Sequence, residues 1–471
     1  MAAGLLLLLA FGIYRPENWT VWPSLDEVRC ISATGAEVYV ATPPGVCVFD
    51  RTRYRLVRTL TRADGIAGEI RLCVHNPARG DVFIATDDRV YRYVPATDRV
   101  EELTAPFKYV SSIGVNALGA YFETDAGAFF RARNAAGFEK MNEFPPGLNW
   151  YGERDTIERR DFPFLTPYTV MDEQLLTHPI TRVRPDRNGR KLFAVAAGYG
   201  IIVYNVSTGF SEAHIRFGPS GSTVSRIARL DNRLWLVGGE TAVSLDSAGD
   251  WHYFLTRPGD LSAGGFRLLL GNVTGLKRSE GLRALAADSV GLLFGTDLGI
   301  YSLGADDKLA QLLSLPRPVN GLLRLGDSLI FGTELGLYLS VGESVVEYSD
   351  PSGATAFGVY DIITAGNGTA YFGTVGGVVA RTRAGEWKRY VPPGMDLRTP
   401  VKTIAASGAR VFMAAGSGVT VLDTRDGSYT AIDSSRGLPN SDISALYADG
   451  RYLWVASPGL LTRLDYTAEL K

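Results

Sequence analysis

The chain has 471 residues, 46% hydrophobic and 11% aromatic, so it has ample material for a packed core. Its 48 basic and 50 acidic residues are spread along the chain and give a net charge of −2, which excludes the concentrated positive field that nucleic-acid binding needs. The densest basic run contains three alternating arginines, which we interpret as one face of a charged outer strand; a polyanion-binding patch is the alternative. This run consists of Arg51, Arg53, Arg55, Arg58 and Arg62.

An apolar run covers residues 2–13 at the N-terminus. It is too short to span a bilayer as a helix, but it has the length of a signal-peptide core, and Ala10 and Gly12 form a small-x-small cleavage pattern. No Lys or Arg precedes it, so a buried first strand and a truncated start are the alternatives. We predict a signal peptide over 1–12, a periplasmic or secreted protein, and no transmembrane helix in the mature chain.

One five-residue motif recurs ten times, from VYVAT at 38–42 to LWVAS at 453–457. It has an apolar residue, an aromatic or aliphatic marker, another apolar residue, a small residue and often Thr. Seven of the nine gaps between markers are 37 to 44 residues long, and the other two, of 72 and 58, indicate insertions. The markers are Tyr39, Phe83, Tyr121, Phe193, Trp235, Leu293, Ile330, Tyr371, Phe412 and Trp454.

Each marker sits in a unit that predicts four strands. An apolar strand and a polar turn precede the marker strand, and a third strand and a more polar fourth strand follow it. In six repeats a Gly lies six residues after the marker, where we expect a hairpin that needs a positive φ. A period near 40 residues with this pattern is typical of a β-propeller. We predict an all-β fold of about ten four-stranded blades over 14–471, with inter-blade insertions at 143–179 and 255–281.

The last repeat has three strands before the chain runs out. Residues 17–22, ENWTVW, resemble a fourth strand, because Trp19 and Trp22 match Trp387 and Tyr390 of another repeat. We predict that this segment completes the last blade, which leaves no open radial edge. Such closure favours one large ring, and two five-bladed propellers are the alternative.

The segment RGLPNSDISALYADGRYLWVASPGLLTRLD, at 436–465, resembles the two-component regulator propeller repeat. It has the GLP turn, an apolar strand, a D-G turn and the LW-apolar-small marker of that family. Weaker copies run through the chain after residue 20. The resemblance implies a propeller of the kind that forms extracellular sensors of membrane histidine kinases, here without a kinase, so only the binding module carries over.

The first insertion is the most unusual segment of the chain. Both insertions link blades, so we expect them on one face, together with the turns between second and third strands. Aromatic side chains beside arginines and carboxylates suit recognition of a glycan, a peptide or a protein. A charged plug held by its own salt bridges, with Phe162, Phe164 and Tyr168 packed on the propeller, is the alternative. The candidate ligand-binding residues are Trp150, Tyr151, Glu153, Arg154, Asp155, Arg159, Arg160, Asp161 and Tyr168.

Four acidic residues, Asp87, Asp125, Asp297 and Glu334, follow a marker Thr directly, in turns that we expect on that same face. They could ring a channel and bind a cation, but we favour support of turn geometry. The three cysteines, Cys30, Cys47 and Cys73, are too few for a paired framework and are expected to be buried free thiols. The four histidines are scattered, so we predict no metal site and no cofactor.

No GxSxG, HExxH or P-loop motif is present, and no catalytic residue is predicted. We therefore favour an exported scaffold or sensor module that binds a ligand or a protein partner on the face with the long loops. The alternatives are a glycan-active hydrolase or lyase, and a purely structural envelope component.

Overall fold

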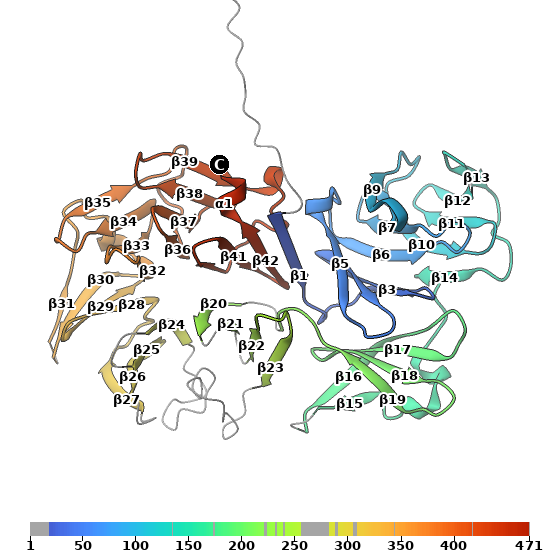
Figure 1. Ribbon diagram of the computed structural model, residues 1–471, viewed down its shortest axis with the longest axis horizontal. Coiled ribbons are helices and arrows are strands. Elements are labelled where there is room, and N and C mark those ends of the chain that lie inside the picture. The colour runs from blue at the N-terminus through green and yellow to red at the C-terminus, as the bar shows by residue number, and fades with distance from the viewer. Residues whose placement is uncertain are drawn as a thin grey trace, which may run out of the picture.

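The computed structural model describes residues 18–470 except 134, 173–174, 221–223, 231–232, 239–240, 256–281, 288–290, 305–308, 343 and 417. The regular secondary structure of the described chain is almost entirely strands, arranged in ten antiparallel sheets (Figure 1). Eight sheets have four strands and two have five, which confirms the all-β fold of ten blades. The predicted signal peptide lies outside the described residues, as does nearly all of the predicted insertion at 255–281. In the described ranges, no helix is long and apolar enough to cross a membrane.

Four sheets, from β2 to β19, come first in the chain. Their strands are β2 (Cys30–Ala33), β3 (Glu37–Thr42), β4 (Gly45–Asp50) and β5 (Leu56–Thr61); β6 (Ile70–His75), β7 (Val82–Thr86), β8 (Val90–Val94) and β9 (Arg99–Glu102); β10 (Val110–Val115), β11 (Gly119–Thr124), β12 (Gly127–Ala132), β13 (Glu139–Met141) and β14 (Asn149–Gly152); and β15 (Thr169–Met171), β16 (Thr177–Pro185), β17 (Lys191–Ala196), β18 (Gly200–Asn205) and β19 (Ser211–Ile215).

Six sheets follow, and the last of them includes the N-terminal strand β1. Their strands are β20 (Arg226–Leu230), β21 (Arg233–Gly238), β22 (Thr241–Leu245) and β23 (Trp251–Leu255); β24 (Leu282–Ala287), β25 (Gly291–Thr296), β26 (Gly299–Gly304) and β27 (Leu309–Ser314); β28 (Gly321–Leu325), β29 (Ser328–Thr333), β30 (Gly336–Val341) and β31 (Ser344–Glu347); β32 (Val359–Thr364), β33 (Ala370–Thr374), β34 (Gly377–Arg381) and β35 (Trp387–Tyr390); β36 (Ile404–Ser407), β37 (Arg410–Ala414), β38 (Val419–Asp423) and β39 (Tyr429–Ile432); and β40 (Ala445–Ala448), β41 (Tyr452–Ser457), β42 (Leu460–Asp465) and β1 (Trp19–Pro23).

Among the residues that the structure describes, helical structure is confined to short turns between strands and after β42. They are η2 (Arg62–Asp64), η3 (Pro95–Thr97), η4 (Arg159–Asp161), η5 (Pro163–Leu165), η6 (Ala354–Phe357), η7 (Ser434–Arg436) and the short α1 (Tyr466–Glu469).

The marker strand follows the first strand of each repeat, and it is the middle strand of the two five-stranded sheets. All ten marker side chains are buried. The motif threonine explains why this strand is followed by a tight turn. Thr374 Oγ1, for example, donates to the carbonyl oxygen of Gly377 at 3.0 Å, and Thr42 Oγ1 donates to that of Gly45 at 2.9 Å. Such local side-chain bonds stabilise turns, so the repeated motif encodes both a core position and a hairpin.

The sheets pack in two groups rather than in a single circuit or in two sets of five. In the first group, Phe193 and Val195 of the fourth sheet pack on Val38 and Val40 of the first. In the second group, Leu236 of the β20 sheet packs against the last sheet, beside Trp454. Four sheets therefore form one group and six the other, and the two groups lie side by side in Figure 1. We call them the four-sheet unit (residues 24–217) and the six-sheet unit (β1 and residues 218–470).

The N-terminal strand completes the last blade, as predicted. β1 pairs antiparallel with β42, with Trp19 opposite Leu464 and Pro23 opposite Leu460. Trp22 stacks on Trp454 with ring centroids 5.5 Å apart and an interplanar angle of 17°. Trp19 and Trp22 lie in separate clusters with the two neighbouring blades, so β1 joins the last blade to both neighbours.

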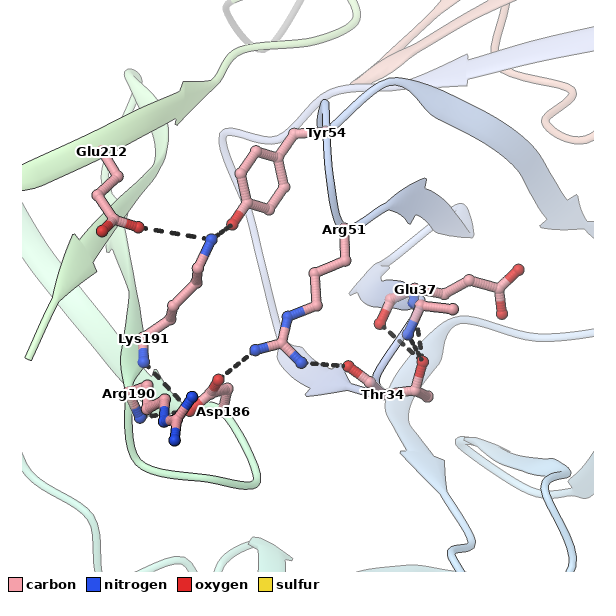
Figure 2. A network of polar contacts seen from close by, with 9 residues as sticks. Thr34, Glu37, Arg51, Tyr54, Asp186, Arg190, Lys191 and Glu212 are labelled. Atoms are coloured by element: carbon pink, nitrogen blue, oxygen red, sulfur yellow. Dashed lines mark hydrogen bonds and ion pairs between the residues drawn. The ribbon is translucent and has the colours of Figure 1, made fainter.

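A polar network joins the first and fourth sheets of the four-sheet unit (Figure 2). Arg51 donates to the buried carboxylate of Asp186 and, at 2.6 Å, to the carbonyl oxygen of Thr34. Lys191 donates to the hydroxyl of Tyr54 at 3.1 Å and lies 3.4 Å from Glu212. The interpretation of the three alternating arginines as one face of an outer strand is wrong. Arg51, Arg53 and Arg55 lie in the connection between β4 and β5, and Arg51 bridges two sheets.

The four-sheet unit is inserted into the six-sheet unit. The chain leaves the six-sheet unit after Pro23 and returns to it at Gly218, and these two residues touch. A Cβ atom added to Gly218 would overlap the carbonyl oxygen of Pro23. Entry and exit therefore lie side by side, which is the usual geometry of an inserted domain.

Candidate functional site

The first insertion crosses the third sheet instead of staying on one face. β13 ends with Met141 opposite Ala128, whereas β14 begins with Asn149 opposite Val115, at the other end of the sheet. Residues 142–148 thus run along the sheet, and β14 returns beside the inner strand β10. The expectation that the whole insertion lies on one face is therefore wrong, because β14 takes a place in the sheet itself.

Two side chains, Tyr151 of β14 and Arg184 of β16, meet between the third and fourth sheets of the four-sheet unit. The Arg184 guanidinium stacks on the Tyr151 ring with 3.6 Å between its Cζ and the ring centroid. It also donates to Asp155 at 2.8 Å, to the carbonyl oxygen of Trp150 at 2.9 Å and to Asn149 at 2.6 Å. Both residues are buried. Buried charge needs this degree of pairing, so Arg184 holds β14 and β16 together.

A cavity of about 570 Å³ lies on one side of this pair. The insertion and β16 form most of its wall, and Arg29 to Ile31, at the start of β2, complete it. Five of the nine predicted ligand-binding residues line it: Tyr151, Asp155, Arg159, Arg160 and Tyr168. This volume is within the range of small-molecule sites.

A second cavity, of about 350 Å³, lies on the other side. Tyr151, Ile157 and Arg184 line both cavities, so these residues separate them. Tyr151 and Arg184 therefore form a shared wall, which we call the floor of the larger cavity, and we call that cavity the pocket. Such a floor gives the pocket a polar, aromatic base fixed by buried hydrogen bonds.

Three predicted residues, Trp150, Glu153 and Arg154, lie outside the pocket. Arg154 donates to Glu123 at 2.6 Å, and its guanidinium lies over the ring of Trp150 at 5.3 Å. This hydrogen bond holds the pKa of the Glu123 carboxyl below its usual range. Glu153 accepts a hydrogen bond from the Tyr109 hydroxyl at 3.2 Å. These contacts anchor the insertion to the rim of the third sheet.

Asp161 supports the local turn of η4. Its carboxylate accepts from the backbone N–H of Glu158 at 2.8 Å, which caps the turn that carries Arg159 and Arg160. Phe162, Phe164 and Tyr168 pack beside Leu165, Ile180 and Val183, as the plug interpretation expects. The insertion is thus a fixed wall, whose apolar side is buried and whose arginines line the pocket.

The four turn acids are divided between the two units. Asp87 and Asp125 belong to the four-sheet unit, and Asp297 and Glu334 to the six-sheet unit. Asp125 accepts from the backbone N–H groups of Lys108 and Tyr109, each at 3.2 Å, and Asp297 accepts from Arg283 at 2.7 Å. In the described ranges, no three His, Cys, Asp or Glu side chains gather as potential metal ligands.

Three arginines of the pocket, Arg29, Arg182 and Arg184, were not predicted. A signal for two of them exists, because Arg182 and Arg184 alternate on one strand and such residues share a face. The β16–β17 register shifts between Ile180 and Arg182, so Thr181 forms a bulge. A bulge changes the direction in which a side chain points, and bulges are common next to active sites. Cys30, at the pocket wall, is one of three buried free thiols, as predicted.

Comparison with known proteins gives similarity at the level of fold. No family model and no curated protein matches the sequence. The solved structure of PorZ, an essential bacterial surface component of the type-IX secretion system of Porphyromonas gingivalis, has a TM-score of 0.61 at 12% identity, covering 95% of this chain and 87% of that chain. Extracellular domains of two B. thetaiotaomicron hybrid two-component systems are also similar. BT4673 has a TM-score of 0.35 at 12% identity, covering 93% of this chain and 69% of that chain, and BT3049 has 0.37 at 15%, covering 92% and 74%.

Proposed function

We propose that this chain is an exported propeller that binds a ligand in the pocket of the four-sheet unit. The observation that carries the proposal is the convergence of Tyr151, Asp155, Arg159, Arg160 and Tyr168 on one cavity of about 570 Å³. A rigid scaffold that presents a long, folded insertion is the usual setting of a recognition site. The apolar run at residues 2–13 supports export to the periplasm or the cell exterior.

A steric block of the pocket tests this proposal on a glycan and peptide array. Thr181 is exposed at the pocket wall, so Thr181→Trp fills the mouth without removing any core side chain. Ala117→Trp is the matched control, because Ala117 is exposed at the cavity on the other side of Tyr151. We expect the unmodified chain and Ala117→Trp to bind the same array ligand and Thr181→Trp to lose it.

Two outcomes contradict the proposal. Equal binding by Thr181→Trp would place the site elsewhere on the molecule. An array without any bound ligand would favour a structural component over a binding module.

A further inference from the structure

The balance of charge in the pocket indicates what kind of ligand it takes. Five arginines line it, and three of them are paired with carboxylates. Arg184 lies 2.8 Å from Asp155, Arg160 lies 2.8 Å from Glu158, and Arg29 lies 3.0 Å from both Glu27 and Glu69. The charges of these three arginines are therefore compensated inside the protein.

The other two arginines, Arg159 and Arg182, have no carboxylate partner among the residues that the structure describes. Arg159 uses one donor on the carbonyl oxygen of Ile180, and its guanidinium lies over the ring of Tyr168 at 5.6 Å. Arg182 is exposed at the wall, and the described residues give its side chain no hydrogen bond. A guanidinium has five N–H donors, so most of the donors of both residues remain available.

These two groups come from different elements that touch. Arg159 lies in η4 and Arg182 on β16, and the bond from Arg159 to Ile180 joins the two elements beside the bulge at Thr181. A pocket lined by two uncompensated guanidinium groups attracts a negative charge. The planar fork of arginine matches carboxylate and phosphate oxygens, and Tyr168 offers an aromatic ring next to it.

We propose that the pocket binds a ligand with an anionic group, a carboxylate or a phosphate, held by Arg159 and Arg182. This inference rests on the proposed function and names the chemical class of its ligand. A sugar acid and a sugar phosphate share the required chemistry, so both are used as probes.

The test is isothermal titration calorimetry of the full chain with two pairs of probes. Trigalacturonate is compared with uncharged maltotriose, and glucose 6-phosphate with glucose. We expect one of the charged probes to bind and its uncharged counterpart not to bind, with an affinity that falls as NaCl is added. The charged probe that binds identifies carboxylate or phosphate as the recognised group.

Substitutions of two arginines that are close in sequence, Arg182 and Arg187, make the test specific. We expect Arg182→Gln to weaken binding about tenfold and Arg182→Glu to weaken it further, because a hydrogen-bonded charge pair is lost and then reversed. Arg187→Glu is the matched control, since Arg187 is exposed and lines the cavity on the other side of Tyr151. Unchanged melting temperatures show that the variants are folded.

The results separate this inference from the proposed function. Failure of both charged probes to bind, or equal binding by Arg182→Glu, overturns the anionic class. If the array ligand is then uncharged and is lost in Thr181→Trp, the pocket remains the binding site and only the anionic class is wrong. An array without any ligand overturns both.

Discussion

At the scale of single residues, the interior of the six-sheet unit contains a charge pair between strands of non-adjacent sheets. Arg226 of β20 lies 3.9 Å from Asp361 of β32 and donates to the carbonyl oxygen of Asn320 at 2.7 Å. The Asp361 carboxylate accepts from the backbone N–H groups of Ile362 at 3.0 Å and Ile404 at 2.9 Å. Despite these partners, burial raises the pKa of Asp361 above its usual range.

This raised pKa predicts a pH dependence of stability. Folded Asp361 keeps its proton to a higher pH than the unfolded chain does, so its contribution to the free energy of unfolding falls as the pH rises through the raised pKa. We expect Asp361→Asn to remove that decrease, because asparagine does not ionise. Urea unfolding of both proteins at a series of pH values upward from 4 measures the difference. Parallel pH profiles for the two proteins would contradict the prediction.

At the scale of elements, the blade hairpin depends on a close approach of backbone. Gly377 begins β34 with a φ of 141°, and a Cβ atom there would overlap the carbonyl oxygen of Tyr390 in the next strand. From the sequence pattern we expected glycine here because the hairpin needs a positive φ, and Gly377 has one. The close approach of the fourth strand is a second reason why glycine is required, and the sequence pattern does not indicate it.

Gly377→Ala separates these two reasons when it is compared with Gly394→Ala. Gly394 has a φ of 73° and open space around its Cα, so alanine there costs about 1 kcal/mol, for conformation alone. At Gly377 we expect an additional loss of about 1–3 kcal/mol from the overlap with β35. Urea unfolding measures both free energies, and equal losses would show that the close approach does not matter.

A bulge recurs in the first strand of five blades and was not predicted. The register shifts at one residue of β6, β10, β16, β24 and β32, which leaves Arg71, Ser111, Thr181, Arg283 and Tyr360 between paired neighbours. The side chains of two of them extend to the rim: Arg71 lies over the Tyr109 ring and Arg283 donates to Asp297. An extra residue in an apolar strand does not alter the spacing between markers, so the sequence pattern does not indicate a bulge.

At the scale of the whole molecule, the ten blades, the four-strand order and the strand that closes the last blade all followed from the repeat. Their grouping into four and six did not. Grouping depends on side chains such as Arg51 and Asp186, which are 135 positions apart and belong to no repeated motif. Likewise, five predicted residues of the insertion meet in the pocket. Its other arginines are Arg29, directly before β2, and Arg182 and Arg184 on β16, in segments whose apolar pattern indicates the core.

Because the sheets form a four-sheet unit and a six-sheet unit, we expect two unfolding transitions in differential scanning calorimetry. Their buried clusters are largely separate, as in independent domains. Trp22→Ala removes the stacking on Trp454 and should cost about 3–5 kcal/mol, which lowers one melting temperature by roughly 10 °C. The transition of the four-sheet unit should not move, and residues 24–217 expressed alone identify it. A single transition that shifts as a whole would contradict this division.

The pairing of β1 with β42 also sets an order of events during synthesis. β1 leaves the ribosome long before β42, the strand with which it pairs. The last strand of the four-sheet unit ends at residue 215, so this unit can fold before Leu464 and Leu461 are made. Trp19 and Trp22 pair with these two residues. Until β42 is made, two tryptophans are therefore unpaired next to a folded unit, and this interval is when the nascent chain most needs protection from aggregation.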